Sequence, residues 1–224
     1  MALRFDAATD RISYSGSGLP DPETAWTLNC WVMVVVDRND FSTFCRLSGA
    51  GATVATVATT ETGTGGPIYA TAGGVLTAAA GMTVGDWYKL AVTCTGTSGN
   101  LYTATATGST QVVSGTVDGV SAPDQICFGG RASGEGAESL DGRIAYAKLY
   151  SSVLTQTQNE TEWNSPTPVI VANLAGYWPL IHAADLTDRS GNARNLTAGS
   201  TAVTTEDGPP IAAWPSRLVS QYGF

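Results

Sequence analysis

The stretch WTLNCWVMVVV, residues 26–36, decides the fold. Its side chains fall into two alternating sets, positions 28, 30, 32, 34 and positions 29, 31, 33, 35, and both sets are largely apolar. Successive side chains of a strand point to opposite faces of a sheet, so a strand that is apolar on both faces is covered on both sides. The stretch therefore predicts a central strand that is buried on both faces.

Shorter segments with the same two-residue period follow this stretch along the chain. They are separated by turn signals, among them Gly99-Asn100 and Asp118-Gly119. Short, regularly spaced strands with such turns are typical of a β-sandwich or barrel. The further strands expected in this way cover residues 87–95, 101–107, 111–117, 142–150, 169–172 and 175–180.

One short helix is predicted over residues 155–163. Thr155 and Gln158 have the spacing of a capping box, in which the first residue caps the helix and the fourth bonds back to it. Ser165-Pro166 follows, and the residue before a proline is biased away from helical geometry. The helix should therefore end near Trp163.

The composition favours a single all-β domain with a sizeable core. Of the 224 residues, 43 % are hydrophobic, only 13 % are charged and 26 are glycine. Such a chain has enough apolar surface to bury a core, and sandwiches of this length are routinely single domains. We expect one sandwich over residues 1–200 and an extended C-terminal arm over residues 201–224.

Two classes of partner are not expected, nucleic acids because of the charge and membranes because of the length of the apolar runs. The net charge is −8 and no basic stripe occurs, which argues against binding to a phosphate backbone. The longest apolar run, residues 30–36, is far shorter than the roughly 20 residues of a membrane-spanning helix. The first residues, MALRFD, lack the features of a signal peptide, so export by that route is not expected.

Three segments resemble the LamG-like and pentraxin jelly rolls. Residues 26–32, WTLNCWV, resemble their F-T-I-S-A-W-V strand, and residues 87–93, WYKLAVT, resemble their W-H-H-L-A-V-T strand. Residues 141–155, DGRIAYAKLYSSVLT, resemble their G-x-I-D-E-V-R-I-Y-N-R-A-L-S segment. The resemblance extends over about residues 2–200. It implies an all-β, concanavalin A-like (LamG-type) jelly-roll sandwich, a fold that hosts lectins, adhesion modules, glycosidases and virion proteins.

A fourth resemblance suggests the type of protein. Residues 174–180 and 188–196, with Gly208-Pro-Pro210, resemble free-standing LamG-like proteins that tailed phages often encode. This implies a non-enzymatic structural protein of the virion, a homo-oligomer that decorates a head or belongs to a tail. Its partners would be the major capsid or tail protein. The alternative is a carbohydrate-binding lectin or adhesion module, assisted by calcium or not.

The resemblance also indicates where calcium would bind. In the loop of residues 129–141, Glu135 and Glu138 align with two pentraxin calcium ligands, and Asp141 ends the loop. Arg131, Ala132 and Ser133 occupy the positions of other ligands, and a cation there opposes calcium. We therefore expect a solvated acidic loop and no cofactor, with Glu135, Glu138 and Asp141 as the only metal candidates.

No catalytic constellation is predicted. The concanavalin A-like glucanases carry closely spaced acids in an E-x-D-x-x-E strand, and this sequence has no such run. His182 is the only histidine, and no G-x-S-x-G nucleophile motif occurs. We expect a binding or structural protein rather than an enzyme.

The aromatic residues and cysteines complete the expectations. Of the six tryptophans, only Trp214 lies in the predicted arm, where it would contact a partner together with Tyr222 and Phe224; the arm could instead fold back over its own sandwich. The four cysteines lack metal-site spacing and lie in strand-like segments. We expect free, buried thiols, and Cys30 with Cys94 is the pairing to test if any disulfide forms.

Overall fold

The central strand forms as predicted. In the computed structural model, all nine residues of β3 (Trp26–Val34) are buried. β3 lies between β8 (Tyr88–Thr95) and β12 (Gly142–Tyr150) and is antiparallel to both. The structure describes residues 1–21, 24–37, 41–49, 52–59, 65–71, 74–117, 123–130, 138–199 and 203–211.

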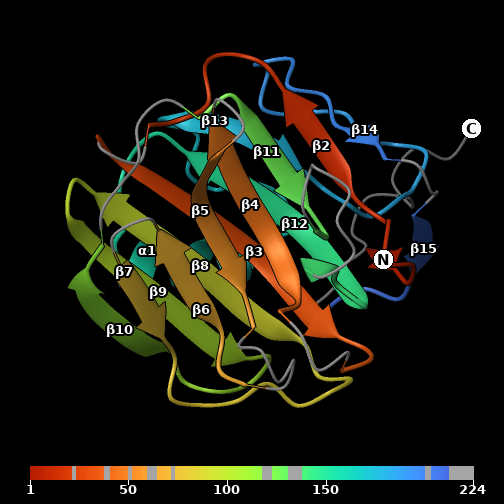
Figure 1. Ribbon diagram of the computed structural model, residues 1–224, viewed down its shortest axis with the longest axis horizontal. Coiled ribbons are helices and arrows are strands. Elements are labelled where there is room, and N and C mark those ends of the chain that lie inside the picture. Colours follow the sequence, from red (N-terminus) through yellow and green to blue (C-terminus); the bar gives the residue numbers. More distant parts are fainter. Residues whose placement is uncertain are drawn as a thin grey trace, which may run out of the picture.

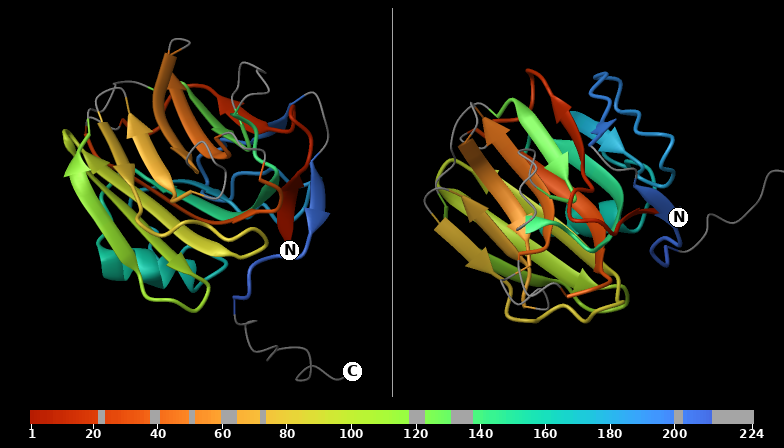
Figure 2. Two further views of the ribbon diagram at one scale, coloured as in Figure 1. Left: turned by 60° about the horizontal axis from the view of Figure 1, so that its bottom comes forward. Right: turned by 45° about the vertical axis from the view of Figure 1, so that its right-hand side comes forward.

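Two antiparallel sheets face each other (Figures 1 and 2). In sheet A the strand order is β10 (Gln111–Thr116), β9 (Ser98–Thr105), β8, β3, β12, β1 (Ala2–Phe5) and β15 (Thr204–Glu206), and β13 (Leu174–Trp178) also pairs with β12. In sheet B the order is β14 (Thr197–Ala198), β2 (Ile12–Ser15), β11 (Gln125–Phe128), β4 (Thr43–Gly49), β5 (Ala52–Ala58), β6 (Ile68–Thr71) and β7 (Gly74–Thr77).

The main core fills the space between the two sheets. Alternate residues of β3, Leu28, Cys30 and Val32, point into it. Aromatic pairs join the layers, with Trp26 edge-on to Tyr69 at 5.9 Å between ring centroids. This two-sheet architecture confirms the predicted β-sandwich.

The predicted helix is α1 (Gln156–Trp163), and both capping-box hydrogen bonds of Thr155 and Gln158 are present. Figure 2 shows α1 on the outer face of sheet A. Two indole N–H groups hold it there: Trp31 donates to the carbonyl of Trp163 at 2.9 Å, and Trp163 donates to the carbonyl of Leu90 at 3.1 Å. The outer face of β3 is therefore covered, as its apolar residues require.

A buried ion pair also attaches α1 to sheet A. Lys148 of β12 places its Nζ 2.8 Å from Oε2 of Glu162, and both side chains are almost fully buried. The ammonium also donates to the carbonyls of Glu162 (2.6 Å) and Ser165 (2.8 Å). Burial lowers the pKa of Lys148, and the facing Glu162 carboxylate opposes that shift. The two carbonyl acceptors and the charge of the facing carboxylate compensate for the removal of this charge from water.

The same carboxylate explains an error in the predicted strands. Oε1 of Glu162 accepts the backbone N–H groups of Val169 (3.0 Å) and Ile170 (2.6 Å). The segment 169–172 is therefore a loop that wraps a buried carboxylate, and the strand predicted there is wrong. The strand predicted after it is present as β13.

The turn predicted at Gly99-Asn100 is also wrong, because β9 already begins at Ser98. Gly99 pairs with Cys94 within the sheet. A Cβ atom at Gly99 would lie 2.8 Å from Cγ2 of Val117, so the glycine makes room for a neighbouring side chain. The turn comes earlier, at Gly96, whose φ of +55° suits glycine.

The four cysteines are free and buried, as expected. The suggested Cys30–Cys94 pairing is wrong because the register separates the two residues. Cys30 lies opposite Leu90, and Cys94 lies opposite Trp26. Four residues of strand correspond to about 13 Å, far beyond the reach of a disulfide.

The described part of the predicted C-terminal arm lies on the sandwich. β15 pairs with β1, and Glu206 bonds to Arg143 (2.5 Å) and lies 3.7 Å from Arg4. Ile211 packs against the cluster of Trp31 on the outer face of sheet A. The predicted contact residues Trp214, Tyr222 and Phe224 lie outside the described residues, and so their role stays a prediction.

Candidate functional site

Two of the three metal candidates, Glu138 and Asp141, already have cationic partners. Oε2 of Glu138 lies 2.5 Å from Nη1 of Arg46, and Oδ1 of Asp141 lies 2.5 Å from Nη2 of Arg4. Glu135 lies outside the described residues. Within the described ranges, no three side chains suited to a metal are grouped together. A calcium ion on this loop would have to compete with two arginines.

We therefore expect the thermal stability to be independent of calcium. Melting in millimolar calcium and in excess chelator should give midpoints that agree within about 1 °C, because arginines already pair with two of the loop carboxylates. A bound ion at a hundred times its dissociation constant would instead add about 2.7 kcal/mol to the stability and raise the midpoint by several degrees. A calcium-dependent rise of several degrees that Glu138→Ala abolishes would contradict this and assign the ion to the loop.

A polar hollow lies elsewhere, between α1 and the turn that joins β9 to β10. We call it the helix groove; its volume is about 380 Å³. Two distant parts of the chain form it with the outer face of β8, because α1 packs beside this end of sheet A. Its lining residues are Lys89, Gly108, Ser109, Thr110, Gln156, Glu160, Trp163 and Asn164.

Both signs of charge are present in the helix groove. The Gln156 side chain donates to Oε1 of Glu160 at 2.9 Å. This hydrogen bond, then one from Thr110 and the nearby Lys89 charge lower the pKa of Glu160, so the carboxylate is ionised at neutral pH. Lys89 Nζ lies 5.4 Å from the centre of the Trp31 ring, at a cation–π distance. The groove therefore combines a fixed acceptor with a cationic donor.

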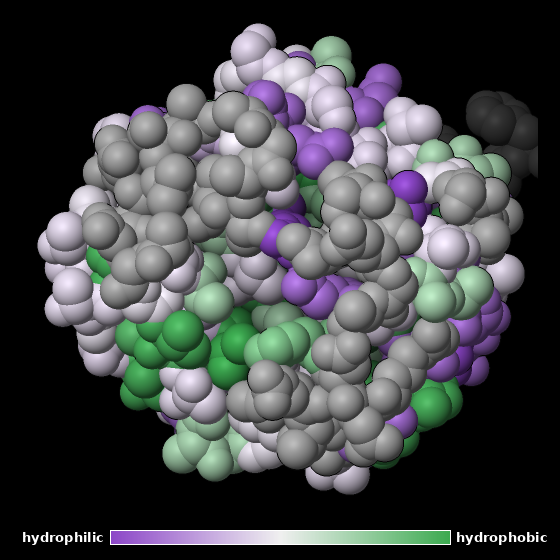
Figure 3. All heavy atoms as spheres, viewed as in Figure 1, coloured by the Kyte–Doolittle hydropathy of each residue, from purple (hydrophilic) through white to green (hydrophobic). Residues whose placement is uncertain are grey.

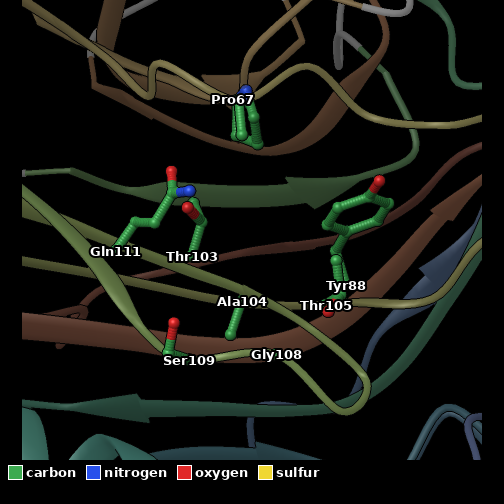
Figure 4. A pocket seen from close by; sticks show the side chains of 9 residues that line it. Pro67, Tyr88, Thr103, Ala104, Thr105, Gly108, Ser109 and Gln111 are labelled. Carbon is green, nitrogen blue, oxygen red and sulfur yellow. The ribbon is translucent and has the colours of Figure 1, made fainter.

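A second hollow opens between the two sheets, on the other side of the same turn. We call it the sheet crevice; its volume is about 170 Å³. In Figure 4 the side chains of Thr103 and Gln111 extend from sheet A toward Pro67 on the opposite side. The complete lining is Pro67, Ala80, Tyr88, Thr103, Ala104, Thr105, Gly108, Ser109 and Gln111. The helix groove and the sheet crevice share Gly108 and Ser109.

A family profile described as the concanavalin A-like lectin/glucanases superfamily matches residues 6–158. The chain belongs to this superfamily. The match covers more than half of the chain and includes both strands and the β12 segment on which the LamG-like resemblance rests. A search of curated protein sequences returned no match.

Solved structures share the superfamily fold at low identity. A candidate carbohydrate-binding protein from Bacteroides ovatus is 16 % identical, with a TM-score of 0.65, over 93 % of this chain and 60 % of the other. This chain thus spans about 60 % of that protein's length. The heptameric SAP-like pentraxin of Limulus polyphemus is 12 % identical, with a TM-score of 0.58, over 88 % and 94 % of the two chains.

A third similar structure comes from a phage. It is the enzymatically active domain of tailspike protein 2 of bacteriophage CBA120, 15 % identical with a TM-score of 0.52, over 77 % of this chain and 28 % of that one. These likenesses confirm the concanavalin A-like jelly roll. No helix among the described residues is long and apolar enough to cross a membrane.

The tryptophans of this superfamily member are part of its framework. Trp26, Trp31, Trp87, Trp163 and Trp178 are all buried, so none of these five is a surface on which a sugar ring could stack. Trp214 lies outside the described residues. Among the described residues, the helix groove therefore presents polar groups and no exposed tryptophan.

The segment that resembles phage-encoded LamG-like proteins is also structural. Asp188 accepts three backbone N–H groups, from Tyr177 (3.0 Å), Ser190 (2.9 Å) and Arg194 (3.0 Å). The Trp178 indole donates to the carbonyl of Arg194 at 2.8 Å. These bonds fasten the 188–194 loop to β13, so its polar residues serve the fold.

The two hollows do not contain the acid pair that glycoside hydrolysis uses. Glu160 is the only carboxylate among their lining residues, and Glu162 lies two residues further along α1, buried against Lys148. Hydrolysis of a glycosidic bond normally requires two carboxyl groups that flank it.

The sequence did not reveal the helix groove as a site. Its residues come from positions 89, 108–110 and 156–164, and no sequence motif for binding or catalysis joins them. The sequence predicted the strand that carries Lys89 and the helix α1, but nothing in it indicated that they lie beside the same turn.

Proposed function

We propose that the protein is a non-catalytic glycan-binding module and that the helix groove is its sugar site. The observation that carries this proposal is the convergence of Glu160, Lys89 and Gln156 with the hydroxyls of Ser109 and Thr110 in one hollow. Sugar hydroxyls both donate and accept hydrogen bonds, so they need a mixed lining of this kind. The volume of about 380 Å³ lies in the usual range of small-molecule sites.

Each groove residue has a defined part in this proposal. The Glu160 carboxylate, held by Gln156, would accept hydrogen bonds from two neighbouring sugar hydroxyls. Lys89 would donate to a ring or hydroxyl oxygen from the floor of the groove, where Trp31 restrains its ammonium. Hydrogen bonds to charged groups contribute about 1.5–3 kcal/mol each, roughly twice those between neutral groups. Glu160 and Lys89 should therefore dominate the affinity.

Glycan binding is tested by screening the full chain on an array and measuring the affinity of the hits by calorimetry. We expect Glu160→Ala and Lys89→Ala each to weaken binding about tenfold or more, because each removes a charged hydrogen-bond partner. Thr161→Ala is the matched control: it is exposed on the same helix, does not line the groove and should bind as the wild type does.

Two results would contradict the proposal. One is the absence of any glycan ligand for the full chain. The other is a glycan that binds the wild type, Glu160→Ala and Lys89→Ala with equal affinity, which would place the sugar elsewhere. Release of reducing ends from a bound glycan would overturn the non-catalytic part alone.

The second candidate is a structural role in a phage particle, in contact with the major capsid or tail protein. Its support is the exposed edge of the sandwich, where β7 and β10 are the outermost strands of their sheets. Val75 on β7 is 61 % exposed and Val112 on β10 is 43 % exposed. Figure 3 shows hydrophobic surface in the region of β6 and β7. Exposed edge strands with apolar side chains favour protein contacts, including homo-oligomers.

The glycan experiment also separates these two candidates. Protein contacts through Val75 and Val112 do not involve Glu160 or Lys89, because neither valine lines the helix groove. A variant that loses glycan binding would therefore keep any assembly made through this edge.

A further inference from the structure

We infer that the ligand is an extended oligosaccharide that crosses the β9–β10 turn and occupies the helix groove and the sheet crevice together. This inference rests on the proposed function, because it assumes that the helix groove holds a sugar. It adds a second subsite and a chain direction, from α1 over the turn to the gap between the sheets.

The continuity of the two hollows is the first argument. Gly108 and Ser109 line both, so these residues are the wall that separates them. At about 170 Å³ the sheet crevice is smaller than the usual range of independent small-molecule sites, which begins near 300 Å³. The crevice is therefore better suited to hold one end of a ligand that is anchored in the larger groove.

The shape of the wall is the second argument. The turn closes with the N–H of Gly108 donating to the carbonyl of Thr105 at 3.3 Å. A Cβ atom at Gly108 would lie only 2.4 Å from Oγ1 of Thr105, so this tight turn favours glycine. Because glycine has no side chain, the wall is low at this point, and a sugar chain can pass over it.

The lining of the sheet crevice is the third argument. Sheet A contributes the hydroxyls of Thr103 and Thr105 and the amide of Gln111, whereas Pro67 and Ala80 form an apolar side. A pyranose ring has apolar C–H faces and hydroxyl edges, so it matches a site with one polar and one apolar wall. The Tyr88 hydroxyl accepts the N–H of Thr83 at 2.8 Å, and this hydrogen bond fixes the Tyr88 ring in the lining of the sheet crevice.

The test is a calorimetric titration with cello-, malto- and chito-oligosaccharides of one to six sugars. We expect the affinity to rise about tenfold or more from the monosaccharide to the tetrasaccharide of the recognised series. The double variant Thr105→Val/Gln111→Ala should remove that rise and leave the monosaccharide affinity unchanged within about twofold. Both substituted side chains are exposed, so the melting temperature should stay at the wild-type value.

The outcomes separate this inference from the proposed function. Equal affinity for monosaccharide and tetrasaccharide would overturn the two-subsite inference and leave the groove as a single-sugar site. So would a double variant that retains the full gain in affinity with chain length. If no glycan on the array bound the full chain, the proposed function would fail, and this inference with it.

Discussion

Replacing Glu162 with alanine is expected to lower the free energy of unfolding by about 3–5 kcal/mol, the usual cost of removing one partner from a buried ion pair. The change would leave the ammonium of Lys148 buried with only the two carbonyl acceptors of Glu162 and Ser165. It would also leave the N–H groups of Val169 and Ile170 without their acceptor. Denaturation in urea, followed by tryptophan fluorescence, measures the loss.

Glu160→Ala is the matched control for this prediction, because it removes the same side chain from the partly exposed side of the same helix. Its stability should stay within about 0.5 kcal/mol of the wild type. Lys148→Met/Glu162→Gln should lose less stability than Glu162→Ala, since glutamine keeps an acceptor for the two N–H groups and no charge remains buried. If Glu162→Ala cost less than about 1 kcal/mol, the buried pair would not hold α1 as described.

Asp188→Ala is expected to have the second largest effect, a loss of about 3 kcal/mol, because unsatisfied buried polar groups cost roughly 1–3 kcal/mol each. The carboxylate of Asp188 is buried and accepts three backbone N–H groups from both sides of its loop. Asp188→Asn should lose less, since the remaining carbonyl oxygen can still accept from Tyr177 and Ser190. Denaturant unfolding of both variants tests this order.

Asp185→Ala provides the comparison for Asp188. It removes a partly exposed carboxylate from the same segment, paired with Arg189 at 2.5 Å on the surface. Exposed ion pairs contribute about 0–1 kcal/mol, so this variant should unfold near the wild-type midpoint. Equal losses for Asp185→Ala and Asp188→Ala would show that the fastening of the loop to β13 does not depend on Asp188.

The sequence was sufficient for features that depend on local patterns. The two-sided apolar period of residues 26–36 predicted a strand that is buried on both faces. The capping box at Thr155 and Gln158 predicted the start of α1 because its two hydrogen bonds join residues only three positions apart. Such features need no knowledge of the register or of distant partners.

Features that depend on long-range contacts were not predicted. The sequence alone predicted a turn at Gly99. The structural reason for a glycine there is its close contact with Val117, which lies 18 positions away along the chain. The ion pairs of two metal candidates were not predicted either, because their arginines lie far away along the chain: Arg46 of β4 for Glu138 and Arg4 of β1 for Asp141.

The helix groove was missed for the same reason as these long-range contacts. It exists only because α1 packs beside the β9–β10 turn, and its polar residues are ordinary surface residues when they are considered singly. A site built from three distant segments without a motif becomes visible only when the sheet order is known.

The central claim, that a glycan binds in the helix groove, is tested most directly by NMR titration of the isotopically labelled full chain. The ligand is the tightest-binding oligosaccharide of the series above, and the amide signals report which residues it approaches. The account predicts that the largest shifts belong to Lys89, Ser109, Thr110 and Glu160, while the signals of Glu138 and Asp141 stay in place. Shifts centred on Glu138 and Asp141, or none at the groove residues, would contradict it.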